Sequence, residues 1–464
     1  MPHSAYRFCI NYLSHISILG FLLVIACISI VLIGDLRLGL FDPNGYLPDR
    51  LSNLIILPDA LLIFWGPFAA AFIVYAVAVI FQVRSDIPLA RKQLWLILFV
   101  AFFCRVIMLF SPPTLSDDIY RYLWDANMQF QGINPYVHAP GSEAIAHLRD
   151  DYHSGINNQE VPTIYPPLMQ VAFAIAAYLW YSPTSMKIFF TLCDMGVILF
   201  IMLLLRNRNF PENRVLVYAW NPLVLVEIAG SGHNDSLAVL LMFAALLAVD
   251  RYRHTQGVFW LTLSMLAKWF TVMLVPTFIR QFKNLKPFLI LPVLVFVLFL
   301  PYMDAGPKLF TGLLVYGAKW RFNDSLFSIL FYLTDSLDVA KGIVITMFAC
   351  VVLYCTVKIE DPVRSAFILL GAYLMLTPVL QPWYLVWIIP FLCIFPNPAW
   401  ILFSGLSALS YHVGIQFILE EIWCEKMWVR YVEYVPFYSL LIVQNVWGQK
   451  RWFRTQRTIQ KALS

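Results

Sequence analysis

Two adjacent carboxylates, Asp117 and Asp118, stand directly before the segment IYRYLWDANMQF. One aspartate, or Ser116, could simply cap the N-terminus of a helix. A second carboxylate exceeds what capping requires, because like charges held together raise one pKa or recruit a cation. Either outcome suits a general base that removes a proton from an acceptor hydroxyl. We therefore predict that Asp117 or Asp118 is catalytic. The pair permits a divalent cation such as Mg²⁺ or Mn²⁺ without requiring one.

A second polar group occupies the run GSGHND at 230–235, and Glu227 stands one helical turn before it. Glycine and asparagine suit a tight turn, because they tolerate positive φ. A turn does not explain Glu227, His233 and Asp235, which are costly near a bilayer unless they face a cavity. We predict that these three residues and Asn234 contact a substrate or a metal.

Three basic residues are candidate phosphate ligands. Lys268 lies in the middle of the apolar segment LSMLAKWFTVML, where snorkelling to the interface needs a long reach. An anionic partner, such as a lipid phosphate, is the more specific interpretation. Lys319 and Arg321 flank Trp320, and a guanidinium matches phosphate oxygens bidentately. The same stretch could also be an ordinary interfacial girdle of aromatic and basic residues.

The motif QPWYLVW places Gln381, Trp383 and Tyr384 at a predicted span boundary, where aromatic belts are expected. We predict that these three residues line the site. His412 lies in an apolar run, and a hydrogen-bonded core histidine is the simpler interpretation there.

The scaffold that must position these residues has the composition of a membrane protein. Of 464 residues, 60% are hydrophobic and 13% are charged, against roughly 25% charged in a typical soluble domain. No polar stretch is long enough for a separate domain, so we predict one membrane domain over 1–464. Basic residues gather near the ends of spans, which the positive-inside rule explains better than a nucleic-acid partner does. Seven of the eight cysteines lie in or beside apolar runs without paired spacing, which predicts packing instead of disulfides or zinc.

Hydropathy predicts an all-α polytopic bundle of about twelve spans. The predicted spans are 16–34, 61–83, 94–110, 186–205, 215–229, 237–249, 288–302, 339–357, 365–376, 383–395, 400–419 and 435–447. Two further apolar segments, 168–181 and 258–279, are expected to be re-entrant or interfacial, because only then do all basic clusters share one side. This arrangement places both termini in the cytoplasm and the large loop 111–165 outside. Motifs of nucleotide motors, zinc proteases and serine hydrolases are missing.

The ordered motifs bear a resemblance to a known group. They are SDDIYRYLWDA, GINPY, YPPL, NPLVLVEIAGSGHNDSLAV, LAKWF, WRFNDSLF and QPWYLVWIIPFL. With these motifs across 116–392, the chain resembles the GT-C superfamily of polyprenyl-phosphate-sugar-dependent glycosyltransferases. Within that superfamily it is most similar to bacterial mannosyltransferase-like members. The segment 1–90 looks like a variable N-terminal part. The sequence departs from relatives in reading DDI where several have Asp-x-Asp.

The resemblance implies a GT-C-type helical fold with its active site on the outer face of the bacterial inner (plasma) membrane. It implies an inverting transfer of a hexose, with mannose expected, from a polyprenyl-phosphate donor held among membrane lipid to a glycan or lipid-linked acceptor. Lys268, Lys319 and Arg321 would stabilise the leaving phosphate. The remaining polar residues of the motifs are implied substrate contacts, namely Arg121, Tyr122, Asp125, Asn134, Tyr136 and Tyr165.

Two other functions are compatible with the residues alone. A secondary transporter or lipid flippase would use the interrupted segments and the buried charges Lys268 and Glu227. An O-antigen ligase or polymerase would also work outside on polyprenyl-linked sugars, but with a pyrophosphate-linked oligosaccharide as donor. The chemical identity of the donor distinguishes all three.

Overall fold

The computed structural model describes residues 14–32, 57–85, 91–113, 115–282, 284–414 and 423–462. Within these ranges the chain is helical, and a single isolated bridge between Phe322 and Val379 is its one strand-like pairing. The all-α prediction is therefore confirmed. The first helices are Ser14–Leu32, α3 (Leu57–Ser85), α4 (Arg91–Met108), α5 (Asp118–Phe130), α6 (Pro167–Leu179), α7 (Pro183–Asn207), α10 (Asp235–Asp250) and α11 (His254–Ala267). The later ones are α12 (Val275–Arg280), α13 (Ile290–Phe299), α14 (Thr311–Lys319), α15 (Leu326–Thr334), α16 (Leu337–Lys358), α17 (Pro362–Leu376), α18 (Pro398–Leu406) and α20 (Met427–Ala462).

The predicted count of about twelve spans is not confirmed. Five stretches of the described chain are long and apolar enough to cross a membrane, and a sharply bent helix pair raises the number to six. The five are Ser14–Leu32, Phe64–Gln82, Pro183–Asn207, Lys286–Lys319 and Leu337–Lys358. Helices such as α6, with 13 residues, are about 20 Å long and fall short of the ~30 Å hydrocarbon core.

Two of the predicted spans are irregular segments inside the protein. The segment 215–229 consists of short pieces: α8 (Leu216–Ala219), α9 (Pro222–Val224) and the π-helical turn η4 (Leu225–Gly230). The segment 383–395 forms the 3₁₀ turns η8 (Pro382–Trp387) and η9 (Ile389–Cys393). Nearly all residues of both are buried. Their apolar composition therefore reflects burial within the protein, which hydropathy alone does not distinguish from contact with lipid.

Side chains satisfy the backbone where the segment at 215–230 departs from a regular helix. Arg105 of α4 pairs with Asp194 of α7 at 2.5 Å and donates to the Ala219 carbonyl at 2.8 Å. Tyr75 of α3 donates its hydroxyl proton to the Val217 carbonyl at 2.8 Å. The Trp220 indole donates to Ile97 at 2.9 Å. Irregular backbone is tolerated at membrane depth when protein groups bond to it in this way.

Two breaks interrupt apolar helices and separate the elements of the site. Pro222–Gly230 and α10 meet at an angle of 119°. The second break is at Lys268, where an extended backbone (φ −156°, ψ 133°) separates α11 from η5 (Trp269–Leu274). The prediction that Lys268 interrupts its apolar segment is confirmed.

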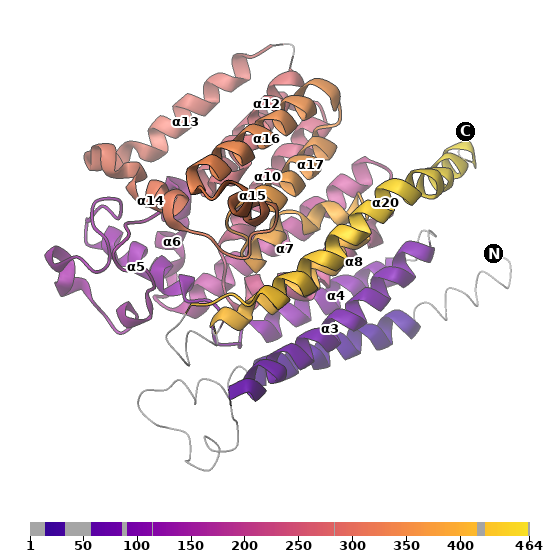
Figure 1. Cartoon of the computed structure of the whole chain (residues 1–464), viewed down its shortest axis with the longest axis horizontal. Helices are drawn as coiled ribbons and strands as arrows, with labels where there is room; N and C mark the ends of the chain where they lie inside the picture. The colour runs from indigo at the N-terminus through magenta and orange to yellow at the C-terminus, as the bar shows by residue number, and fades with distance from the viewer. Residues whose placement is uncertain are drawn as a thin grey trace.

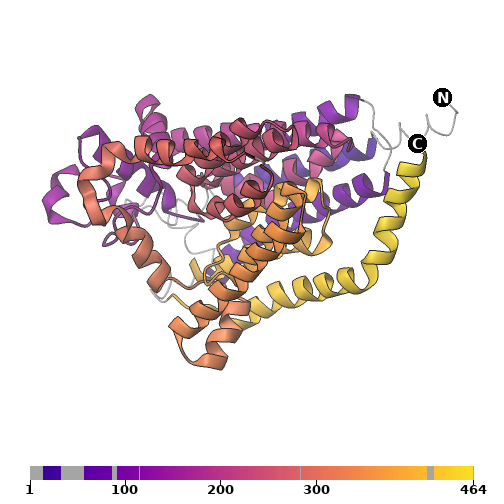
Figure 2. The same cartoon turned by 90° about the horizontal axis from the view of Figure 1, so that it is seen from above.

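The bundle carries its largest connecting segment at one end. Figures 1 and 2 show α5 and its flanking loops at one end of the molecule and the C-terminal part of α20 at the other. The long helix α20 runs along one side of the bundle. In Figure 1, α13 and α14 run along one edge of the bundle, and α16 lies beside α12, α15 and α17. Only 17% of the most apolar window is buried in each of the stretches Lys286–Lys319 and Leu337–Lys358.

Candidate active site

The carboxylate pair stands at the start of α5, and neither side chain serves as a cap. Asp117 occupies the cap position, but its side chain makes no capping hydrogen bond. Ser116 accepts from the Asp118 backbone N–H at 3.3 Å and performs that role instead. Both carboxylates are half-buried. Helix capping therefore does not account for either carboxylate.

The environment of Asp117 is suited to a general base. Burial, followed by the nearby charge of Asp118, raises the pKa of the Asp117 carboxyl to about 6. The Asn157 side-chain amide donates to Asp117 Oδ1 and opposes that rise, as does the charge of His233. A carboxyl with a pKa near the working pH combines basicity with a useful ionised fraction.

Three side chains, Tyr411, Glu227 and His233, form a chain of polar contacts at the break before α10. The Tyr411 hydroxyl donates to Glu227 Oε1, and His233 Nδ1 lies 3.0 Å from Glu227 Oε2. Glu227 is fully buried and His233 is 1% exposed. The imidazole stacks on Trp383 with 4.0 Å between ring centroids and 18° between planes. These contacts fix the orientation of the histidine ring.

Lys268 reaches the same break from the other interrupted helix. Its Nζ lies 2.5 Å from Asp235 Oδ1 and 3.1 Å from Asn234 Oδ1. The Trp387 indole also donates to Asp235 Oδ1, at 2.5 Å. The ammonium lies 5.6 Å from the Tyr384 ring centroid and 5.7 Å from that of Trp387. The Lys268–Asp235 ion pair therefore neutralises two charges, either of which would be costly if left unpaired in this low-dielectric setting.

The carboxylate pair and the break before α10 belong to one site. The charges of Asp118 and Asp235 both act on His233, Tyr122 and Tyr316. Gly232 has φ +79°, and a Cβ there would lie 2.6 Å from Ile119 of α5. The start of α5 therefore packs directly on the broken helix, and only glycine permits this approach.

Other residues of the first large loop form a polar network behind the carboxylates. Arg121 Nε donates to Asp125 Oδ1 at 2.9 Å, while Thr163 and Gln170 donate to Oδ2 at 2.5 and 2.9 Å. Asp125 is fully buried and Arg121 is 9% exposed. Because both carboxylate oxygens are occupied, the network fastens α5 to α6. Substrate contact by Arg121 and Asp125 stays a prediction.

Asn134, Tyr136, Tyr122 and Tyr165 also make internal contacts. Asn134 donates to the Tyr302 carbonyl at 3.1 Å and accepts from the Tyr136 N–H at 3.0 Å. The Tyr136 hydroxyl donates to the Tyr165 carbonyl at 2.6 Å. Tyr122 and Tyr165 meet edge to face, with 5.3 Å between centroids. Of these four, Tyr122 and Tyr165 are close enough to Asp118 to sense its charge.

Three predicted residues lie outside this cluster of contacts. Arg321 donates to Asp324 Oδ2 at 3.0 and 2.8 Å, and its guanidinium lies 4.3 Å from the Phe331 ring. Lys319 is exposed at the end of α14. Gln381 is half-buried, and its carbonyl accepts from the Tyr384 N–H at 3.0 Å. The structure does not bring Lys319 or Arg321 into contact with the residues of the two breaks.

Sequence reasoning did not identify Asn157, Tyr411, Trp387 or Tyr316. Tyr316 and Tyr384 share a hydrogen bond of 2.7 Å between hydroxyls. Of these four residues, only Trp387 could have been found from the sequence, because it follows Trp383 by one helical turn in QPWYLVW. The neighbouring His412 accepts from the Lys426 N–H at 2.9 Å, which confirms a hydrogen-bonded histidine there.

A divalent cation at Asp117 and Asp118 stays a prediction. Among the described residues, no three histidine, cysteine or acidic side chains are grouped so as to hold a metal ion. Two carboxylates could hold Mg²⁺ only together with waters and a phosphate of the substrate. We derive no step through a metal. Of the seven cysteines predicted to be packing residues, Cys27, Cys104, Cys193, Cys355 and Cys393 are buried, Cys350 is exposed, and Cys9 lies outside the described residues.

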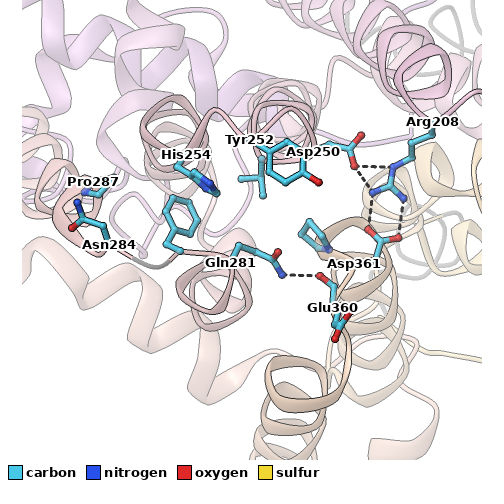
Figure 3. A pocket seen from close by; sticks show the side chains of 12 residues that line it. Arg208, Asp250, Tyr252, His254, Gln281, Asn284, Pro287, Glu360 and Asp361 are labelled. Atoms are coloured by element: carbon cyan, nitrogen blue, oxygen red, sulfur yellow. Dashed lines mark hydrogen bonds and ion pairs between the residues drawn. The ribbon is translucent and has the colours of Figure 1, made fainter.

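A separate cavity of about 740 Å³ lies at the far end of α10. Figure 3 shows Arg208 between Asp250 and Asp361 on one side of it. Arg208 bonds to both carboxylates at 2.6 Å and so ties the ends of α7 and α10 to the start of α17. None of the predicted site residues lines this cavity. It is distinct from the candidate active site.

A helical membrane scaffold that holds a carboxylate pair above a broken helix is the arrangement expected of a membrane-embedded glycosyltransferase. Residues 29–282 match the family described as "Alpha-(1->6)-mannopyranosyltransferase, N-terminal domain", and residues 328–414 match "MptB C-terminal domain". The first match covers more than half of the chain. The protein therefore belongs to the alpha-(1->6)-mannopyranosyltransferase family, and the resemblance found in its motifs is confirmed.

A curated relative supports the same assignment over a shorter stretch. The chain is 26% identical over 166 residues to "Alpha-(1->6)-mannopyranosyltransferase A" of Mycobacterium tuberculosis. The alignment covers 35% of this chain and 32% of the relative, so the chain spans about a third of that protein in the match.

Proposed function

We propose that the protein is an inverting mannosyltransferase that moves mannose from a polyprenyl-phosphate lipid to a glycan or lipid-linked acceptor. The observation that carries the proposal is the Asp117 carboxyl, with its raised pKa, beside a broken helix that holds paired buried charges. Mannose as the sugar follows from the name of the family. The polyprenyl-phosphate donor and the inverting displacement are what the resemblance implies, and the carboxylate pair supplies the base.

Asp117 is the proposed base and Asp118 its electrostatic partner. Asp117 is assigned as the base because its raised pKa lies near the working pH. Asp117 takes the proton of the acceptor hydroxyl as that oxygen attacks the anomeric carbon. The bond from this carbon to the phosphate oxygen breaks, and polyprenyl phosphate leaves with the electron pair. The charge of Asp118 favours the positive charge that develops on the sugar.

Inversion sets the stereochemistry of the donor. A single displacement reverses the configuration at the anomeric carbon, so an α-linked product requires a β-linked mannosyl phosphate. Lys268 is the proposed cation nearest to the leaving phosphate, with a side chain that is 17% exposed. Lys319 and Arg321 remain proposed phosphate contacts only if their loop approaches the break when the donor binds.

The outer face of the bacterial inner membrane is the proposed place of reaction. Asp235 and Asp250 mark the two ends of the 16-residue helix α10, which are about 24 Å apart. The end at Asp250 is surrounded by basic residues, including Arg208, Arg251 and Arg253. The positive-inside rule assigns that end to the cytoplasm and the Asp117 end to the outside. Both termini would then be cytoplasmic.

A transfer assay with purified full-length protein tests the proposal. The donor is a polyprenyl-phosphate mannose, and the acceptor is a mannose-terminated oligosaccharide. We expect mannosyl transfer by the wild type, a loss of at least 10²-fold in Asp117→Asn and a smaller loss in Asp118→Asn. Wild-type-like rates in Asp117→Asn would overturn the base assignment. Transfer only from a pyrophosphate-linked oligosaccharide would overturn the donor class.

The alternative of a secondary transporter or lipid flippase is not favoured. The family match is to transferases. Lys268 and Glu227, whose burial motivated the alternative, are both paired with neighbours at one end of the bundle. A transport pathway would instead place charges along the depth of the membrane.

A further inference from the structure

Three successive residues at the broken helix share an unusual bonding pattern. In each of His233, Asn234 and Asp235, one polar atom is anchored to the protein and another is left without a partner. The atoms without a hydrogen-bond partner among the described residues are His233 Nε2, Asn234 Nδ2 and Asp235 Oδ2. The side chains are between 0% and 1% exposed. Buried polar atoms of this kind are rare and call for an explanation.

The anchors explain which atom of each side chain is left over. Glu227 holds His233 Nδ1 through its backbone carbonyl at 3.1 Å, and Glu227 Oε2 lies 3.0 Å from the same nitrogen. Lys268 holds Asn234 Oδ1 at 3.1 Å and Asp235 Oδ1 at 2.5 Å. The anchored ends fix each side chain, so the remaining ends cannot turn to find other partners. Such a set is organised in advance for an external ligand.

We propose that these three atoms bind hydroxyl groups of the transferred sugar and do not bind the phosphate of the donor. This assignment rests on the proposed function and names the part of the substrate that the break recognises. The Asn234 amide can only donate, and the ionised Asp235 oxygen can only accept. A sugar hydroxyl donates and accepts, so it satisfies both. A phosphate oxygen accepts from Asn234 but is repelled by Asp235.

The site lies where the proposed reaction requires the sugar. His233 is close enough to Asp117 and Asp118 to interact with both charges. A hexose held at His233, Asn234 and Asp235 therefore lies beside the proposed base. Lys268, on the other side of Asp235, remains available for the leaving phosphate at its exposed face.

The structure describes this subsite in a closed state. The three atoms are inaccessible, and Trp383 covers a face of the His233 imidazole. Trp383 is half-buried in the 3₁₀ turn η8. A sugar that enters must displace covering side chains, and Trp383 is the one whose contact with His233 is directly observed.

The test measures binding, so it does not depend on turnover. Purified full-length protein is titrated with farnesyl-phosphate mannose and, separately, with farnesyl phosphate, which lacks the sugar. Asn234→Asp and Asp235→Asn each keep an oxygen for Lys268 and reverse the hydrogen-bonding character of the free atom. His233→Asn keeps a nitrogen for Glu227 and removes Nε2. The control is Asn213→Ala, which alters a buried asparagine with unpartnered polar atoms in another part of the fold.

We expect each of the three variants to weaken farnesyl-phosphate mannose roughly tenfold, the value of one lost hydrogen bond near 1.4 kcal/mol. Farnesyl phosphate should bind within twofold of wild type in His233→Asn and in the double variant Asn234→Asp/Asp235→Asn, which keep the net charge beside Lys268. The double variant Asn234→Asp/Asp235→Asn keeps the net charge. Its affinity for farnesyl-phosphate mannose should nevertheless stay low, because the donor and acceptor positions remain exchanged. Asn213→Ala should leave both affinities unchanged.

A different pattern would overturn the assignment alone. If Asn234→Asp weakens both ligands, Asp235→Asn strengthens both and the double variant restores them, the break senses the charge of the phosphate. Unchanged affinities in all variants would also refute a sugar contact. Failure of the wild type to bind either ligand would instead overturn the proposed donor, and this assignment with it.

Discussion

The hydrogen bond from Asn157 to Asp117 gives a pH profile that can be worked out in advance. Asn157 lies in the loop before α6 and donates its amide to Asp117 Oδ1. The bond stabilises the charged carboxylate, so its removal in Asn157→Ala raises the pKa of Asp117. Because Asn157 is exposed, we take about 1 kcal/mol for a bond to a charged group, which corresponds to about 0.7 pH unit.

This shift has a definite kinetic signature. A base acts when ionised, so kcat/KM falls as the pH drops through its pKa. With Asp117 moved from about 6 to roughly 6.7, the ionised fraction at pH 6 falls about threefold. At pH 8 it changes by less than a tenth. The measurement is kcat/KM for mannosyl transfer between pH 5 and pH 8.5.

Two further variants make the test specific. Asn209→Gly removes an exposed asparagine side chain in a distant loop and suits the positive φ of 57° at that position, so its acid limb should match the wild type. Asp118→Asn removes the charge that raises the pKa, so its acid limb should move to lower pH. An acid limb that stays in place in Asn157→Ala would refute Asp117 as the titrating base.

Three predictions concern stability, measured as thermal unfolding in detergent. Asp125→Ala leaves Arg121 and its other donors unpaired and should cost roughly 3–5 kcal/mol, whereas Asp125→Asn should cost less. Arg105→Met leaves the buried Asp194 uncompensated and should destabilise similarly, with part of the loss recovered in Arg105→Met/Asp194→Leu. Arg208→Gln should cost roughly 1–2 kcal/mol at neutral pH, because two carboxylates then face each other.

The Arg208 prediction also has a pH dependence. Burial raises the pKa of the Asp361 carboxyl. The hydrogen bonds and charge of Arg208 outweigh burial and hold that pKa below its usual value. A depressed pKa contributes stability above the unfolded value, and this contribution disappears as the pH falls through the folded value. The difference between wild type and Arg208→Gln should therefore begin to shrink below about pH 4, the unfolded value, and vanish only below the depressed pKa of Asp361 in the folded protein. A difference that persists under acid conditions would point to lost packing of the arginine stem.

The sequence predicted the breaks better than the spans. A lysine in an apolar run and a glycine-rich polar turn are local signals, and the chain is interrupted at both. The failure at 215–229 and 383–395 has a physical cause: these segments are apolar because protein surrounds them, so a hydropathy scan counts them as spans. The 119° bend before α10 depends on Arg105 and other distant side chains, which no local pattern encodes.

The sequence did not show which partners the predicted site residues have in the fold. Arg321 was predicted to hold phosphate, but its guanidinium pairs with Asp324, three residues later in the same motif. Asp125 was predicted to contact substrate, yet both its oxygens are occupied by neighbours from α5, α6 and the loop between them. Tyr411 carries no sequence signal, because its only distinguishing feature is a hydrogen bond to a residue 184 positions away.

The site joins the two parts of the chain that match the family. The first, 29–282, supplies the charges: the carboxylate pair, Glu227, His233 and Lys268. The second, 328–414, supplies aromatic groups that cover or hold them: Trp383 on His233, Trp387 on Asp235 and Tyr411 on Glu227. Each buried charge of the first part at the broken helix is thus oriented by a ring of the second. The N-terminal part alone would contain the proposed base and Lys268, but the charged groups at the break would lack the contacts that hold them in place.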